Sequence, residues 1–146
     1  YIQQSLEETL GLTVELSVAG DNSLFIADRN EGNYDFFLGG WYSDYNDPLD
    51  FLYTNYADAY GMSFGGYSNT DYDALADQLV GETDMDKRLD IYKQMEQILL
   101  LDDCAFAPIY YATKQVLLQN WVKDYRTSSF GASAEFIWTY IDGKNQ

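Results

Sequence analysis

The residues best suited to chemistry in this 146-residue chain are concentrated in one short stretch, positions 39–48. A glycine pair there precedes Trp41, the carboxylate of Asp44 follows three positions later, and Pro48 ends the stretch. Glycine allows another backbone to approach closely. Tryptophan offers a flat apolar wall with one N–H donor, and aspartate offers a full negative charge. This combination predicts a recognition edge for a molecule that carries a cation and an extended backbone, which is binding chemistry rather than catalysis.

Side chains that commonly perform catalysis are scarce. The chain contains no histidine, which is the commonest general base and the commonest metal-binding side chain. Ser–His and Cys–His mechanisms are therefore excluded. The single cysteine, Cys104, precedes an apolar run at 105–108, and we expect a buried, inert thiol there.

Three evenly spaced carboxylates, Asp44, Asp47 and Asp50, invite comparison with a calcium-binding loop. An EF-hand loop that began at Asp44 would need glycine at position 49 and glutamate at position 55. The chain has Leu49 and Asn55 at these positions, so the match fails. We expect no metal and no cofactor.

The charge of the chain is strongly negative and unevenly distributed. The formal net charge is −16, and residues 1–73 hold 13 acidic side chains against one base, Arg29. A nucleic-acid-binding surface needs clustered lysine and arginine, so we expect no nucleic acid partner. The acidic surface serves either to attract cationic ligands or only to keep the protein in solution.

Fourteen tyrosines are a second feature typical of binding surfaces. Tyrosine is favoured where a surface must be apolar and hydrogen-bonding at once, as in sugar and peptide sites. Carboxylate pairs also serve glycoside hydrolysis, in which one acid donates a proton and the other attacks or activates water. A carbohydrate-active or oligosaccharide-binding domain that uses carboxylates and tyrosines is therefore the alternative to a peptide-binding one.

The elements that lead into positions 39–48 predict an α/β fold. Alternating apolar and polar residues predict a strand at 12–18, and a helix capped by Asp21 or Asn22 follows to about position 30. Residues 34–41 are largely apolar on both faces and predict a second strand that runs into the glycine pair. Strand, helix and strand in this order are typical of a parallel sheet with helices packed on it.

Other helices, strands and one loop are predicted from periodicity and from start and stop signals. Helices are expected over residues 1–10, after Pro48, from a cap at 68–71 through Val80, and from a capping box at Thr83 and Asp86 to Asp102. The apolar stripe expected to face the core in the last helix consists of Met85, Leu89, Tyr92, Met95 and Leu99. Strands are expected at 105–112, 114–118 and 136–141, and a glycine-rich loop at 58–67 either lines a site or only connects elements.

With these elements in place, the segment Gly40–Pro48 resembles a motif of the oligopeptide- and dipeptide-binding proteins of bacterial ABC importers, the peptide/nickel family of extracellular solute-binding proteins. The likeness continues in order and spacing over residues 1 to about 125, and the ordered set makes it specific. The further pieces are Leu10–Leu16, Tyr34–Phe36, Tyr67–Asn69, Tyr72–Leu75, Arg88–Tyr92, Glu96 and Ala107–Tyr111.

The resemblance implies the C-terminal portion of a two-lobed, type II periplasmic-binding-protein fold that closes on an extended peptide. Residues 1–125 would form the later half of the ligand-binding second lobe, and residues 126–146 the hinge return and a terminal strand toward the first lobe. No capping residue precedes the first helix, so we expect the chain to be a piece of a longer protein.

Members of this family are not enzymes. They are extracytoplasmic, as cell-surface lipoproteins or periplasmic proteins, and they deliver their ligand to an ABC permease. The resemblance therefore implies an oligopeptide or dipeptide ligand, an ABC permease as partner, and a monomer. A sensing or adhesion protein on the same scaffold is a further alternative.

The resemblance also implies a ligand-binding set, Gly40, Trp41, Tyr42, Ser43 and Asp44, which we call the 40–44 site. In the family, the aspartate of this motif pairs with the N-terminal ammonium of the peptide, and here that position is Asp44. Gly40 and Tyr42 would offer backbone groups to the ligand, and Trp41 would wall a side-chain pocket.

Geometry adds a requirement and leaves alternatives open. In a regular strand, residues 41 and 44 point to opposite faces, so the strand must end near Tyr42 if Trp41 and Asp44 are to line one cleft. Otherwise Trp41 is a core residue, and Asp44 caps the helix after Pro48 or pairs with a lysine. Some oligopeptide binders of this family have a basic residue two positions before the Gly-Trp pair. This chain has Leu38 at that position, so the contact that the basic residue makes to a ligand carboxylate is missing.

Overall fold

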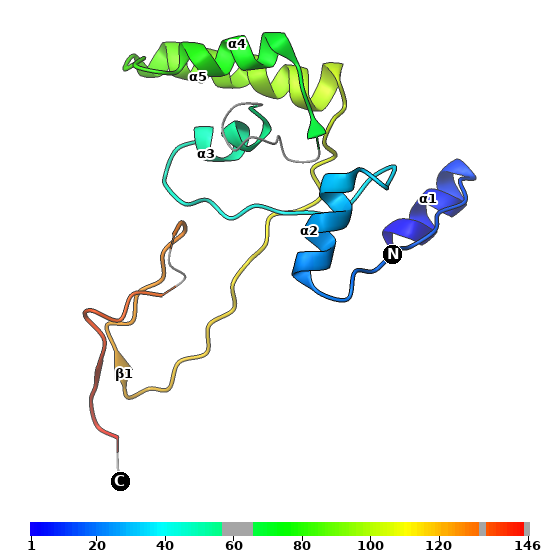
Figure 1. Cartoon of the computed structure of the whole chain (residues 1–146). Helices are drawn as coiled ribbons and strands as arrows, with labels where there is room; N and C mark the ends of the chain where they lie inside the picture. Colours follow the sequence, from blue (N-terminus) through cyan, green and yellow to red (C-terminus); the bar gives the residue numbers. More distant parts are fainter. Residues whose placement is uncertain (57–65, 132–133, 145–146) are drawn as a thin grey trace. The chain divides into compact units, whose positions relative to one another are not determined.

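The computed structural model describes residues 1–56, 66–131 and 134–144. The chain divides into two compact units, Tyr1–Leu38 and Gly39–Gln146 (Figure 1). The predicted loop at 58–67 lies almost entirely outside the described residues. The predicted division of the chain at residues 125 and 126 concerns the lobes of a larger fold, and it stays a prediction.

The first unit contains two helices whose ends match the predicted signals. Helix α1 (Ile2–Leu10) stops at Gly11, which adopts a left-handed φ of 67° that glycine tolerates without strain. Helix α2 (Asn22–Glu31) begins after Asp21, whose carboxylate accepts hydrogen bonds from the backbone N–H groups of Ser23 and Leu24.

The second unit is built around a group of helices. They are α3 (Leu49–Leu52), the 3-10 turn η1 (Tyr53–Asn55), α4 (Thr70–Gln78), α5 (Met85–Glu96) and the π-helical η3 (Gln97–Asp102). Helices α4 and α5 lie side by side, and α3 contacts α5 (Figure 1). The N-cap of α5 is Asp84, whose carboxylate accepts from the backbone N–H groups of Asp86 and Lys87. The predicted capping box with Thr83 as the cap is therefore wrong by one residue.

The hydrophobic core lies among these helices. Helix α5 and η3 contribute Ile91, Tyr92, Met95 and Leu99, of which Met95 is fully buried. The other core residues are Leu52, Tyr72, Ala76 and Leu79.

The predicted stripe is wrong at its N-terminal end. Met85 and Leu89 are 61% and 46% exposed, respectively. The buried face of α5 is centred on Ile91, Tyr92 and Met95, which is the side that α3 and α4 cover. Periodicity alone did not fix which flank of the stripe a neighbouring helix would cover.

The strands differ most from the predictions. Among the described residues the only ladder is antiparallel, between β1 (Val122–Lys123) and β2 (Tyr140–Ile141). β2 falls within the predicted strand at 136–141 and is shorter than it. The predicted strands at 12–18, 34–41, 105–112 and 114–118 form no ladder. A strand needs a neighbouring strand for its backbone N–H and C=O groups, and among the described residues no strand ladder reaches these segments.

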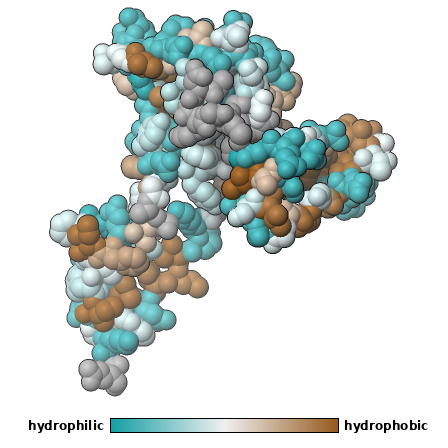
Figure 2. All heavy atoms as spheres, viewed as in Figure 1, coloured by the Kyte–Doolittle hydropathy of each residue, from teal (hydrophilic) through white to brown (hydrophobic). Residues whose placement is uncertain are grey.

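Several apolar side chains in these segments are exposed. Val18 and Leu117, for example, are 88% and 100% exposed. On the face shown in Figure 2, the part formed by α4 and α5 is mainly hydrophilic, whereas hydrophobic colour gathers over the C-terminal part. Cys104 is also exposed, so the predicted buried thiol is wrong. No helix among the described residues has the length and apolar character that a membrane span requires.

Candidate functional site

The 40–44 site begins in a segment that joins no strand ladder among the described residues, and it runs into a bend. A side chain at Gly40 would meet no atom within 4 Å, so the space beside its backbone is open. Trp41 is 36% exposed and Tyr42 is 70% exposed. The chain bends over residues 44–47, where the backbone N–H of Asp47 donates to the carbonyl of Tyr45 at 3.0 Å.

A buried carboxylate, Asp50 in α3, holds two members of this site together. Asp50 is only 4% exposed. Its Oδ2 accepts a hydrogen bond from the indole Nε1–H of Trp41 at 3.0 Å and a second from the backbone N–H of Asp44 at 2.8 Å. The indole of Trp41 and the backbone of Asp44 therefore converge on one oxygen atom.

This geometry decides between the interpretations left open for Trp41 and Asp44. Trp41 is partly exposed and lies outside the core cluster. The carboxylate of Asp44 is exposed and forms no ion pair among the described residues. At the start of α3, the backbone N–H of Leu49 donates instead to Asp47 at 2.9 Å. The capping and lysine-pairing interpretations of Asp44 are therefore wrong for the part of the chain that the structure describes.

The remaining site residues have neighbours from later in the chain. The carbonyl of Ser43 accepts a hydrogen bond from the backbone N–H of Gly131 at 2.8 Å. The ammonium of Lys114 lies 5.8 Å from the centre of the Tyr42 ring, a cation–π distance. A positive charge therefore lies beside Tyr42, in the middle of the 40–44 site.

The bend that carries Asp44 is tied to α5 by a second carboxylate. Asp47 forms an ion pair with Arg88 at 2.8 Å and accepts a hydrogen bond from the Tyr92 hydroxyl at 2.6 Å. Arg88 also contacts the Tyr92 hydroxyl and donates to the carbonyls of Leu79 and Glu82. The bend is thus connected to α5 and to the loop between α4 and α5.

These contacts shift the ionisation of both acidic partners. Partial burial acts to raise the pKa of Asp47, but hydrogen bonds from Tyr92 and the Leu49 backbone, together with the Arg88 guanidinium, hold it below its ordinary value of 3.8. Burial and the neighbouring Asp47 carboxylate raise the pKa of Tyr92 to about 12. Asp47 is therefore ionised and Tyr92 neutral at physiological pH.

Sequence reasoning missed the roles of Asp50 and Asp47, because it considered these acids only as calcium ligands. The available signal was the placing of Asp50 between Leu49 and Phe51, where an acid in a short apolar helix must be either exposed or satisfied internally. Among the described residues no acidic or cysteine cluster has the form of a metal site.

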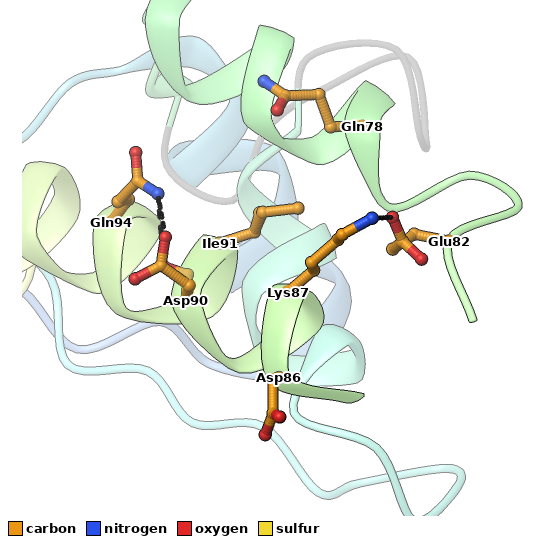
Figure 3. Close-up of a pocket in the computed structure, with 7 residues that line it drawn as sticks. All are labelled: Gln78, Glu82, Asp86, Lys87, Asp90, Ile91 and Gln94. Atoms are coloured by element: carbon orange, nitrogen blue, oxygen red, sulfur yellow. Dashed lines mark hydrogen bonds and ion pairs between the residues drawn. The ribbon is translucent and has the colours of Figure 1, made fainter. Parts of the chain in front are cut away.

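A separate hollow lies on the surface of α4 and α5, away from the 40–44 site (Figure 3). It measures about 600 Å³ and is wide open to solvent. Its polar side chains engage one another: Gln94 donates to Asp90 at 2.9 Å, and Lys87 lies 3.7 Å from Glu82. No residue of the 40–44 site lines this hollow.

Solved structures and sequence relatives agree on the class of protein. The chain is similar to the structure of Listeria monocytogenes OppA bound to peptide, with a TM-score of 0.73 and 32% identity over 96% of this chain and 26% of that one. The chain is thus part of a type II periplasmic-binding-protein fold. The helices and small sheet described above are one portion of such a lobe.

Sequence comparison shows which family and which proteins the chain is similar to. Residues 1–63 match the model for the middle region of bacterial extracellular solute-binding proteins, family 5. The chain is 30% identical to the periplasmic oligopeptide-binding protein OppA of Escherichia coli over 82% of its own length. It is 32% identical to the oligopeptide-binding protein OppA of Bacillus subtilis over 84% of its length. The chain spans 21% of each of these curated relatives. Over these stretches the chain is similar to this family of solute-binding proteins.

Proposed function

We propose that this chain is part of an extracytoplasmic receptor that captures oligopeptides or dipeptides for an ABC importer. The OppA proteins of E. coli and B. subtilis are named as oligopeptide-binding proteins, which supports peptides over the carbohydrate alternative. Relatives of this kind are substrate-binding proteins, so we expect capture without catalysis. The receptor would act as a monomer at the cell surface or in the periplasm, with the permease as its partner.

In this proposal the exposed carboxylate of Asp44 receives the N-terminal ammonium of the peptide. A carboxylate and a primary ammonium form charge-assisted hydrogen bonds, which are about twice as strong as neutral ones. The indole of Trp41 provides an apolar wall beside the first side chain of the peptide. The open space beside Gly40 lets the ligand backbone approach and bond to Gly40 and Tyr42, as an added strand would. Ser43 lies between Tyr42 and Asp44 in the sequence.

One observation carries the proposal: Asp50 gathers the Trp41 indole and the Asp44 backbone, while the Asp44 carboxylate remains exposed. An exposed carboxylate whose backbone is held in place, and which forms no ion pair among the described residues, is suited to bind a cation from outside. The acidic balance of residues 1–73 adds attraction for such a ligand.

The test is a charge-removing substitution in the full-length receptor that contains this sequence. We expect Asp44→Asn to weaken binding of tri-alanine by ~3–5 kcal/mol if water is excluded from the pair. N-acetyl-tri-alanine, which lacks the ammonium, should lose far less. Isothermal titration calorimetry with both peptides measures the difference.

The matched control is Asp86→Asn, which removes the same charge from an exposed position on α5. It should leave both affinities unchanged. Equal losses for the free and the acetylated peptide in Asp44→Asn would show that Asp44 does not bind the ammonium.

A further inference from the structure

Asp50 is the most deeply buried carboxylate among the described residues, and both of its hydrogen-bond donors belong to the 40–44 site. An ionised carboxylate is costly to remove from water unless hydrogen bonds compensate for the lost hydration. Here the compensation comes from Trp41 and Asp44, two residues predicted to touch the ligand. The two hydrogen bonds that stabilise the buried carboxylate of Asp50 therefore also fix the positions of Trp41 and Asp44.

The element that carries Asp50 is itself firmly anchored. The backbone N–H of Asp50 donates to the carbonyl of Asp47 at 3.1 Å. Two residues further on, the carbonyl of the buried Leu52 accepts a hydrogen bond from the hydroxyl of Tyr72, a fully buried residue of α4. The Asp50 carboxylate is therefore held from the core side and reaches outward to the site.

We propose that Asp50 is a positioning residue that fixes the Trp41 indole and the Asp44 backbone for recognition of a peptide N-terminus. This inference rests on the proposed function and assigns a part in it to a residue that never meets the ligand. Without the Asp50 oxygen, the indole loses this acceptor and the backbone N–H of Asp44 loses its hydrogen bond to α3. The Asp44 carboxylate then samples several positions, and the ligand must select one of them at a cost in affinity.

The experiment uses the full-length receptor and three substitutions at this position. Asp50→Ala removes the acceptor, whereas Asp50→Asn keeps one oxygen that can accept both hydrogen bonds. Asp50→Leu fills the buried space without an acceptor and replaces Asp50→Ala if that variant does not fold. Asp86→Ala, at an exposed position on α5, is the control for loss of an acidic side chain.

Two quantities are measured in each variant whose unfolding temperature is close to that of the wild type. The first is the dissociation constant for tri-alanine, by calorimetry. The second is the proton shift of the Trp41 indole N–H in protein labelled with ¹⁵N-tryptophan, assigned by its loss in Trp41→Phe. A hydrogen bond to a carboxylate moves this proton downfield, and a general loss of stability does not.

We expect Asp50→Ala to weaken tri-alanine binding by about tenfold or more, as for a polar group that loses its partner, and to move the Trp41 resonance upfield. Asp50→Asn should retain affinity within about threefold, because its oxygen rescues both hydrogen bonds. Asp86→Ala should match the wild type in both measurements.

An Asp50→Ala or Asp50→Leu protein with wild-type affinity overturns the proposal, whether or not the indole resonance moves. An unmoved resonance overturns it as well. If the proposed function is wrong, the result differs from these outcomes: the wild type would bind tri-alanine and N-acetyl-tri-alanine with equal affinity. In that case the indole resonance still reports whether Asp50 holds Trp41 in place.

Discussion

The carboxylate of Asp47 and the guanidinium of Arg88 lie 2.8 Å apart, although 41 positions separate them in the sequence. Asp47 belongs to the bend that carries the candidate site, and Arg88 belongs to α5, which forms one wall of the core. The pair thus links a surface bend to a helix that contributes to the core of the second unit. The predictions below follow from this link and from the packing around it, and all concern the full-length protein that contains this sequence.

The ion pair should contribute measurably to stability. Arg88→Met keeps much of the side-chain volume but removes the charge and the bonds to Asp47, Leu79 and Glu82. Because the pair is partly shielded from solvent, we expect a loss of about 1.5–3 kcal/mol in the free energy of unfolding, measured in urea. Lys93→Met, at an exposed position on the same helix, should cost less than about 0.5 kcal/mol. Similar costs for the two variants would show that the pair contributes nothing.

The contribution of Asp47 should depend on pH in a defined direction. Its pKa is lowered in the folded state, so its stabilising effect is fully present above the ordinary value of 3.8 and is lost as the pH falls through the folded pKa. The stability difference between wild type and Asp47→Asn should therefore be constant near neutrality and shrink in acid. Unfolding curves from pH 7 to pH 2 measure it. A difference that grows in acid would contradict the assigned sign.

The buried hydroxyl of Tyr72 should stabilise the contact between α4 and α3. It donates to the carbonyl of Leu52 at 2.7 Å, and burial raises the pKa of Tyr72, which keeps the hydroxyl protonated as a donor. Tyr72→Phe leaves that buried carbonyl without this donor, so we expect a loss of about 1–3 kcal/mol. Tyr110→Phe changes a tyrosine that is 78% exposed, and it should have little effect. Thermal unfolding distinguishes the two.

Two apolar residues of α5 should respond very differently to truncation. Met95 is fully buried, so Met95→Ala should cost about 2–5 kcal/mol in the free energy of unfolding. Leu89 belongs to the predicted stripe but is 46% exposed, so Leu89→Ala should cost less than about 1 kcal/mol. Equal losses of stability in the two variants would show that Leu89 faces the core, as the sequence predicts.

Substitutions at two glycines near the site should distinguish an effect on folding from an effect on ligand binding. Gly131 has a φ of 65°, and Gly131→Ala should destabilise the fold by about 1–2 kcal/mol because a side chain is strained there. Gly40 has open space and no such φ, so Gly40→Ala should leave the unfolding temperature unchanged. If a peptide backbone approaches Gly40 as proposed, the same substitution should weaken tri-alanine binding. Unchanged affinity in Gly40→Ala would remove Gly40 from the site.

The helices could be predicted because their signals are local. Asp21 caps α2 through backbone groups two and three residues away, and Gly11 ends α1 through its own backbone conformation. The five α-helices in the described part of the chain accordingly lie close to their predicted positions. The predicted strands at 12–18 and 34–41 were wrong, because their signal is not local. Alternation marks a segment that can pair with another strand, but it does not supply that strand.

The sequence by itself determined the helices, the acidic character and the motif that contains Trp41 and Asp44. The tertiary structure alone decided that Asp50 is buried beneath this motif, that Asp47 meets Arg88, and that Asp44 stays exposed. The reason is physical: capping and helical periodicity act within a few residues, whereas the burial of a carboxylate depends on segments that only folding brings together. Three acids at equal spacing read alike in the sequence, and their surroundings give each a different role.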